Sequence, residues 1–289
     1  GPVTVGNQTA PYYRALHGTL RDADYRHVID KYDGDIRYTD SVIGELLDLL
    51  DELGLAERTV LVVTSDHGEN FDDHPRYPIN HRQLYDPVLR VPLIVRGPGV
   101  PDGSTVAEQV ETVDLMPTVL ELLGVEHPLE LHGRSLTGTW SGRPAGPAGP
   151  ADPEGAGEQD RAAFAEYFSS DGEAIRAVRT AGWKLVVRGT WSGEGGPEWT
   201  GPDELYDLRT DPAERHDLAG PQSVDPVDSV DPVDPAAAAA EDELRRLLAR
   251  WVRRHGADEL PLDAGSDERG PDPAEDRSVT EDLEALGYL

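Results

Sequence analysis

Apolar positions along the first half of the chain follow two different periods. Over residues 25–53 they recur every three to four positions, which predicts an amphipathic α-helix that Gly54 ends. Residues 60–64 are all apolar or β-branched, and this unbroken run predicts a strand buried on both faces, as in a parallel sheet. A second apolar run predicts the next strand over residues 86–95, before Gly97-Pro98-Gly99 breaks it. This order of helix and strand indicates an α/β fold class.

The second half of the chain shows shorter elements. Residues 113–123 predict a helix, in which Asp114 supplies a favourable negative charge near the N-terminus. Residues 174–187 contain two alternating runs and predict an antiparallel hairpin, to which residues 204–208 add a strand. Residues 243–254 carry apolar side chains on one face and predict an amphipathic helix.

Composition divides the chain into six segments. Stretches rich in Gly, Pro, Ala or acidic residues separate the regular patterns, and the dense Pro of the Val-Asp-Pro repeats disfavours a regular element there. We predict an α/β core over 1–140, a flexible insertion over 141–160, a small antiparallel β subdomain over 161–219, a low-complexity linker over 220–240, a packing helix over 241–256, and an acidic tail with a short terminal helix over 257–289.

Acidic residues dominate the composition. The chain has 56 Asp and Glu against 26 Lys and Arg, a formal net charge of −30, and its only lysines are Lys31 and Lys184. This balance is typical of a soluble protein adapted to high salt, where counterions screen the self-repulsion. The periodic apolar runs argue against the alternative, a disordered acidic chain. The charge also excludes nucleic acid as a partner, because Lys and Arg hold phosphate backbones.

The sequence contains no Cys, which excludes disulfides and thiolate metal sites. No apolar run approaches the roughly 18 residues of a membrane span. No signal peptide is visible, which favours a cytoplasmic location. Because the sequence starts at Gly1 rather than Met, we expect its true N-terminus to be missing. The oligomeric state is left open.

Polar residues follow the predicted strand over 60–64. Asp66 and His67 sit at its carboxyl end, the edge at which open α/β sheets bind ligands, and Gly68 allows a sharp turn after them. A carboxylate oxygen and an imidazole nitrogen are both good ligands for a divalent cation. The alternative is a strand-end turn whose Asp caps the next segment. Downstream, the polar loop over 69–83 contains a His and Arg pair, His81 and Arg82, and polar loops beyond strand ends often carry site residues.

Several ordered motifs carry a resemblance to a known family. They are Thr64-Ser65-Asp66-His67-Gly68-Glu69, His74, His81, Leu84-Tyr85-Asp86, Arg90-Val91-Pro92-Leu93-Ile94-Val95, Val113-Asp114-Leu115-Met116-Pro117, Leu131-His132-Gly133-Arg134-Ser135-Leu136 and Glu204-Leu205-Tyr206-Asp207-Leu208. In this order and spacing they resemble the C-terminal half of a sulfatase, a family of the alkaline-phosphatase-like superfamily. The resemblance covers roughly residues 25–219 and the last few residues of the chain. It implies a partial α/β sandwich followed by a small antiparallel sheet and a helix.

The resemblance also implies roles for individual residues. Asp66 and His67 would be metal ligands, and the hard oxygen ligand favours calcium, or else magnesium or manganese. His81 falls at a position that contacts the sulfate group and stabilises charge on the leaving oxygen. Arg82 would be a second anion contact, because a guanidinium pairs well with an oxyanion. The alternative for Arg82 is a surface ion pair. The expected substrate is a small-molecule or glycan sulfate ester.

The family's nucleophile has no counterpart in the sequence. Sulfatases use a formylglycine made from the Cys or Ser of a Cys/Ser-x-Pro-x-Arg motif, and no such motif occurs here. Asp66 and His67 would be at most half of a metal site, because such sites normally need three or more protein ligands. We therefore expect a truncated or split chain that is inactive alone. Two alternatives stay open: a phosphodiesterase or phosphoglycerol transferase of the same superfamily, and a degenerate paralogue without catalysis.

Overall fold

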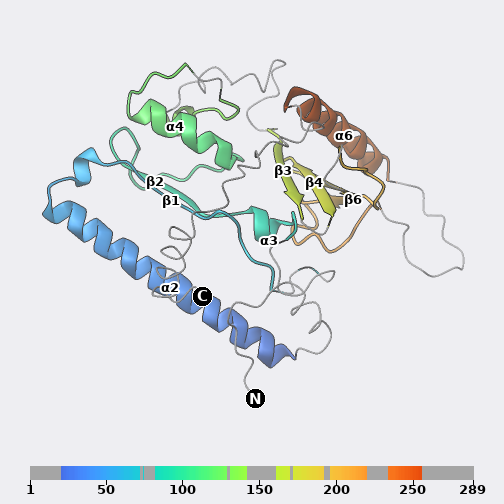
Figure 1. The fold of residues 1–289 in the computed structure, drawn as a ribbon, viewed down its shortest axis with the longest axis horizontal. Coiled ribbons are helices and arrows are strands. Elements are labelled where there is room, and N and C mark those ends of the chain that lie inside the picture. Colours follow the sequence, from blue (N-terminus) through green and yellow to red (C-terminus); the bar gives the residue numbers. More distant parts are fainter. Residues whose placement is uncertain are drawn as a thin grey trace, which may run out of the picture.

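Two groups of elements make up the computed structural model, which describes residues 21–71, 74, 82–128, 131–141, 161–169, 172–191, 196–219 and 234–255. We call residues 21–141 the core lobe and residues 161–255 the sheet lobe. Figure 1 shows the core lobe on one side, with helices α2, Asp22–Glu52, and α4, Leu115–Leu122, and strands β1, Leu61–Thr64, and β2, Leu93–Arg96. The strands of the sheet lobe and helix α6, Pro235–His255, lie on the other side. The short helix α3, Asp86–Leu89, lies on the side of the core lobe that is next to the sheet lobe (Figure 1). None of the helices in these ranges is long and apolar enough to span a membrane.

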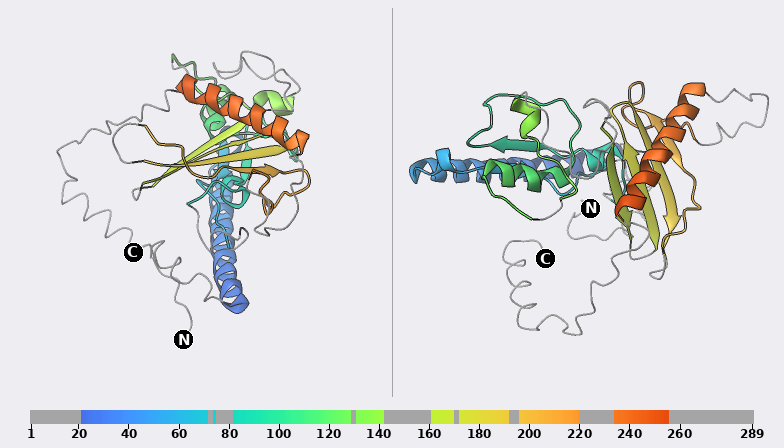
Figure 2. Two further views of the ribbon diagram at one scale, coloured as in Figure 1. Left: turned by 90° about the vertical axis from the view of Figure 1, so that its right-hand side faces the viewer. Right: turned by 90° about the horizontal axis from the view of Figure 1, so that it is seen from above.

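The long helix α2, Asp22–Glu52, forms where the 3.6-residue period predicts it. Gly54 ends it with a φ of +66°, a left-handed conformation that glycine adopts without strain. Val28 is its one buried residue among those described, and Figure 2 shows the helix projecting from the rest of the molecule. One side of its apolar stripe is half-buried, while the adjoining side is exposed to solvent: Val42, Leu46, Leu49 and Leu53.

Strand β1, Leu61–Thr64, pairs antiparallel with β2, Leu93–Arg96. The predicted parallel arrangement is wrong for this pair, and three β1 residues are half-buried rather than fully buried. The run predicted as one strand over 86–95 is divided, because residues 86–89 form helix α3, Asp86–Leu89. Pro87 fixes φ near the helical value in the first turn, which favours a helix start over a strand.

Shorter helices complete the core lobe. They are the 3₁₀ turns η1, Ala56–Arg58, and η2, Thr112–Asp114, followed by α4, Leu115–Leu122, and α5, Thr137–Ser141. Asp114 lies at the N-terminus of α4, as predicted, and it is fully buried. It accepts the backbone N–H of Arg134 at 2.9 Å and pairs with the Arg161 guanidinium at 2.5 Å. Asp114 therefore ties the core lobe to the start of the sheet lobe.

The sheet lobe contains four antiparallel strands in sequence order. They are β3, Ala163–Phe168; β4, Glu173–Arg179; β5, Trp183–Thr190; and β6, Glu204–Asp207. The β4–β5 pair is the predicted hairpin, and β6 is the predicted added strand. Because side chains alternate between the two faces of the sheet, each face builds its own apolar cluster.

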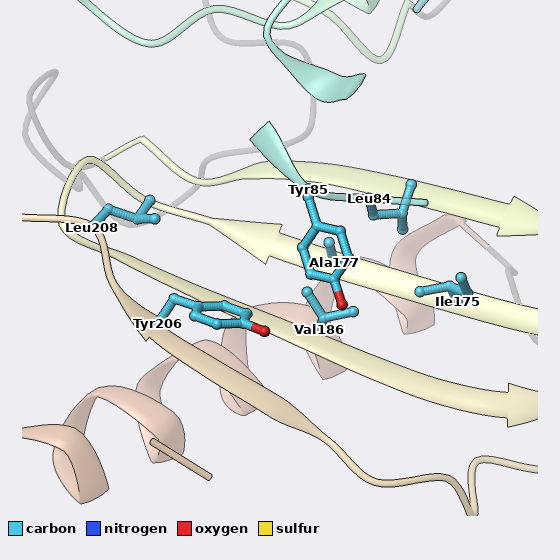
Figure 3. Close-up of a cluster of buried hydrophobic side chains, with 7 residues drawn as sticks. All are labelled: Leu84, Tyr85, Ile175, Ala177, Val186, Tyr206 and Leu208. Atoms are coloured by element: carbon cyan, nitrogen blue, oxygen red, sulfur yellow. The ribbon is translucent and has the colours of Figure 1, made fainter. Parts of the chain in front are cut away.

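Helix α6, Pro235–His255, covers one face of this sheet, where Leu244 and Leu248 pack against Val178 and Leu185. It begins inside the segment predicted as a linker. Asp234 caps it, accepting the Ala236 backbone N–H at 2.9 Å, and the alanines that follow have the highest helix propensity. Residues 84 and 85 of the core lobe cover the other face, where Tyr85 lies above Ala177 and Val186 (Figure 3).

Candidate active site

The turn after β1 brings Asp66 and His67 together through local hydrogen bonds. The His67 backbone N–H donates to Asp66 Oδ1 at 2.9 Å, and the Ser65 hydroxyl donates to the His67 carbonyl at 2.7 Å. The His67 Nδ1–H donates to the Gly68 carbonyl at 2.8 Å. This bond fixes the tautomer and leaves Nε2 with its lone pair, the form in which imidazole binds metals.

Two atoms of this turn suit a cation. His67 Nε2 lies 3.7 Å from Asp66 Oδ2, a separation that one ion can bridge with ligand distances of about 2.1 Å. The two side chains are 45% and 86% exposed, so an ion could reach them from solvent. The hydrogen bond from the His67 backbone N–H lowers the pKa of the Asp66 carboxyl, which is therefore ionised at neutral pH. No group of three or more metal-ligating side chains occurs within the described part of the chain.

The structure brings together two of the four predicted site residues. His81 lies outside the described residues. Arg82 is half-buried in the segment that leads to α3, and its predicted anion contact stays a prediction. His74, one of the residues that carry the family resemblance, is 6% exposed and stacks on Tyr85 with 3.7 Å between ring centroids.

A cavity of about 1250 Å³ extends from the Asp66 turn to the sheet lobe. Its lining comes from both lobes and includes Thr64, Asp66, His67, Gln83, Arg90 and Arg179. Ligand sites are concave and frequently lie between structural units, so this cavity is the candidate substrate site.

Buried charges from the sheet lobe anchor the segment beside this cavity. The Asp86 carboxylate forms ion pairs with the Arg179 guanidinium at 2.9 Å and with Lys184 Nζ at 3.1 Å. Lys184 Nζ also lies 2.5 Å from Glu214 Oε1, and Glu214 Oε2 accepts the Asp86 backbone N–H at 2.6 Å. Burial alone would raise the pKa of Asp86, but Arg179 and Lys184 outweigh it and lower that pKa. The segment over 84–86 is thus fixed by charge pairs as well as by packing.

A second buried network centres on Glu204. Its carboxylate accepts hydrogen bonds from the hydroxyls of Tyr85 at 2.6 Å and Tyr206 at 2.7 Å, and from the Nε–H of Arg188 at 2.8 Å. Burial and the Glu204 charge raise the pKa of both tyrosines, which stay protonated donors. Burial opposes ionisation of Glu204, but the charge of Arg188 and the tyrosine hydrogen bonds lower its pKa overall. The sequence placed Tyr85 and Glu204 in family motifs, but no local pattern predicts that they meet.

We expect Glu204→Gln to lower the free energy of unfolding by about 2 kcal/mol at pH 7, because it removes charge-assisted hydrogen bonds in a buried site. The difference from wild type should shrink as the pH falls. The folded-state pKa of Glu204 lies below its ordinary value of 4.5, so its contribution is full above about pH 5 and is lost as the pH falls through the folded-state value.

Urea unfolding of both proteins between pH 7 and pH 3 measures this difference. Glu243→Gln on α6, where the side chain is 53% exposed, is the matched control and should change stability by less than about 0.5 kcal/mol. A Glu204→Gln deficit that stays constant down to pH 3 would contradict the ionised role of Glu204.

Two family models match the chain. One is described as Sulfatase and covers residues 1–125; the other is described as N-sulphoglucosamine sulphohydrolase, C-terminal, and covers residues 77–230. Among curated proteins, Arylsulfatase K of Xenopus laevis is 30% identical over 63% of this chain and 32% of its own length. An N-acetylglucosamine-6-O-sulfatase of Bacteroides thetaiotaomicron is 29% identical over 68% of this chain and 33% of its own length. The chain thus spans about a third of these relatives.

Solved structures show the same relationship. A 2-O GAG sulfatase superposes with a TM-score of 0.64 at 25% identity, covering 86% of this chain and 48% of that protein. A phosphonate monoester hydrolase from Silicibacter pomeroyi superposes with a TM-score of 0.54 at 28% identity, covering 74% and 38%. These similarities confirm the predicted α/β fold class.

Proposed function

Because the chain belongs to the sulfatase family of the alkaline-phosphatase-like superfamily, we propose that its Asp66 turn is part of the metal site of a sulfate-ester hydrolase. The observation that carries this proposal is the pairing of an ionised carboxylate with an imidazole nitrogen whose tautomer is fixed. The two atoms are 3.7 Å apart, and both residues line a large cavity. A divalent cation held there, calcium or else magnesium or manganese, would supply Lewis-acid polarisation of a sulfate oxygen.

The chain's own residues have distinct tasks in this proposal. Asp66 supplies negative charge, and His67 presents Nε2 because its Nδ1–H is held by the Gly68 carbonyl. His81 would donate a proton or hydrogen bond to the leaving oxygen, and Arg82 would pair with the sulfate anion. The ion pairs of Asp86 would hold the segment that follows Arg82 in place.

We propose a sulfated sugar or a small sulfate ester as substrate. The relatives support this choice, since one is named for N-acetylglucosamine 6-sulfate and another, from Bacteroides thetaiotaomicron, for a hexuronate 2-sulfate. The cavity also has room for a sugar, because its volume of about 1250 Å³ exceeds the roughly 300–1000 Å³ that is typical of ligand pockets.

We further propose that the nucleophile and the remaining metal ligands come from polypeptide outside these 289 residues. The exposed side of α2 supports this, since Val42, Leu46 and Leu49 are 45%, 43% and 49% exposed, whereas apolar faces of soluble helices normally pack against other elements. This chain covers 48% of the solved sulfatase, so about half of that protein has no counterpart in these 289 residues.

A second candidate function is phosphoester or phosphonoester hydrolysis. The similarity to the phosphonate monoester hydrolase favours it, and the Asp–His pair fits either anion. A non-catalytic paralogue is the third possibility. Assays with an aryl sulfate and an aryl phosphate diester, on the chain combined with the upstream region of its gene, separate all three: the preferred ester names the class, and no turnover of either in a metal-loaded protein favours the paralogue.

We expect Asp66→Asn to weaken calcium or manganese binding by at least about 10-fold, because it removes a charged ligand. Isothermal titration calorimetry on the chain measures this. Asp48→Asn, at an exposed position of α2, is the matched control and should leave the affinity unchanged. Equal affinity of Asp66→Asn and wild type would show that the cation binds elsewhere.

A further inference from the structure

Gln83 carries a buried amide that no described residue satisfies. Its side chain is 1% exposed, and neither its Oε1 nor its Nε2 has a hydrogen-bond partner among the residues that the structure describes. A buried amide left in this state loses its hydration without compensation, so native proteins rarely keep one without a reason. Either an ordered water or a ligand would supply the missing partners.

The neighbours of Gln83 prevent it from turning out to solvent. Leu84 and Tyr85 follow directly and are 5% and 1% exposed. The Tyr85 hydroxyl is held by Glu204 at 2.6 Å, and Asp86 is held by Lys184 at 3.1 Å. The backbone at Gln83 is therefore fixed, and its amide stays inside the protein.

Gln83 lines the same cavity as Asp66 and His67. A second glutamine, Gln109, also lines it but is fully used inside the protein. Its Nε2 donates to the carbonyls of Arg161 at 2.8 Å and Arg179 at 2.9 Å, and its Oε1 accepts from the Arg179 guanidinium. Gln109 is thus structural, whereas Gln83 lines the cavity with an amide whose donor and acceptor no described residue uses.

We propose that Gln83 is a specificity-determining residue that binds the hydroxyl groups of a sugar sulfate. This rests on the proposed function, since it takes the sulfate end of the ligand to lie at the Asp66 turn. An amide offers one acceptor and two donors side by side, which complements sugar hydroxyls, each of which both donates and accepts. An uncharged amide is suited to this neutral part of the ligand, whereas cations suit the sulfate.

The test compares two probes with and without sugar hydroxyls, glucose 6-sulfate and phenyl sulfate, titrated into the calcium-loaded chain and followed by NMR. Gln83→Leu should weaken glucose 6-sulfate about 10-fold and change phenyl sulfate less than about twofold, because phenyl sulfate has no hydroxyl to lose. Gln83→Met is a second variant of similar length in case leucine does not fit. Urea unfolding of both variants should show stability equal to or above that of wild type, because each removes an orphaned amide.

Three outcomes overturn the proposal. The first is that wild type does not bind glucose 6-sulfate. The second is that Gln83→Leu lowers the affinity for both probes equally. The third is that Gln83→Leu lowers neither affinity, which would mean that the amide holds a buried water only. Asp66→Asn tests the proposed function separately, because it should weaken both probes. Loss with Asp66→Asn but not with Gln83→Leu rejects the Gln83 role alone, whereas selective loss with Gln83→Leu and none with Asp66→Asn rejects the proposed metal turn alone.

Discussion

Lys184→Met is expected to lower the free energy of unfolding by about 3–5 kcal/mol, which is the usual cost of removing one partner from a buried ion pair. Lys184 is 0% exposed, and its Nζ lies between Asp86 at 3.1 Å and Glu214 at 2.5 Å. Asp86 keeps Arg179 after the change, but Glu214 loses its cation while it stays fully buried. The methionine keeps most of the lysine stem, so the effect reports the charge rather than a cavity.

Urea unfolding at pH 7 measures this change. Lys31→Met is the matched control, since Lys31 is the other lysine of the chain and is exposed on α2. Adding Glu214→Gln to Lys184→Met should recover about 1–3 kcal/mol, because it neutralises the carboxylate that was left unpaired. A loss below about 1 kcal/mol in the single variant would show that water reaches this site.

Gly68→Ala is expected to cost about 3 kcal/mol of stability, at the upper end of what overpacking costs, and to weaken cation binding at the Asp66 turn. A Cβ at Gly68 would lie 2.1 Å from the Pro87 carbonyl oxygen, which belongs to backbone and cannot move aside as a flexible side chain could. The Gly68 N–H also donates to the Val88 carbonyl at 2.8 Å, so displacing this contact separates the turn from α3.

Thermal unfolding and calcium titration of the same samples measure both effects. Gly44→Ala in α2 is the control: nothing lies within 4 Å of its Cβ position, and alanine should stabilise the helix by about 0.5–1 kcal/mol. A Gly68→Ala protein as stable as wild type, with undiminished calcium affinity, would mean that the turn and α3 can move apart without consequence.

Patterns within a few residues determined several parts of this protein. The 3.6-residue period and Gly54 fixed α2, and alternation fixed the β4–β5 hairpin, because both depend on contacts between near neighbours. The Asp66–His67 pair is also local, since adjacent residues after a strand must share its end. The ordered motifs were enough to identify the family.

Tertiary structure decided what depends on distant residues. The sequence could not show that β1 pairs antiparallel with β2, because a short apolar run fits either direction. It could not show that α3 interrupts the run over 86–95. The Asp86 backbone N–H there donates a hydrogen bond to Glu214, which is 128 positions away in the sequence. The start of α6 is set by a local cap, Asp234, and by the alanines that follow it. The neighbouring proline-rich repeats made this segment look like a linker in the sequence.

The charged interior is the clearest case. Lys184 and Glu204 sit in strands whose apolar neighbours predict burial, yet nothing local names the partners that make burial of a charge tolerable. The partners of Lys184 are Asp86 from the core lobe and Glu214 from the sheet lobe, and the partner of Glu204 is Arg188. Each lies at least 16 positions away along the chain, so only the folded structure brings these pairs together. The Gln83 amide also depends on tertiary structure, because its surroundings in space decide whether a buried amide has a partner. Only the folded chain shows that no described residue supplies one.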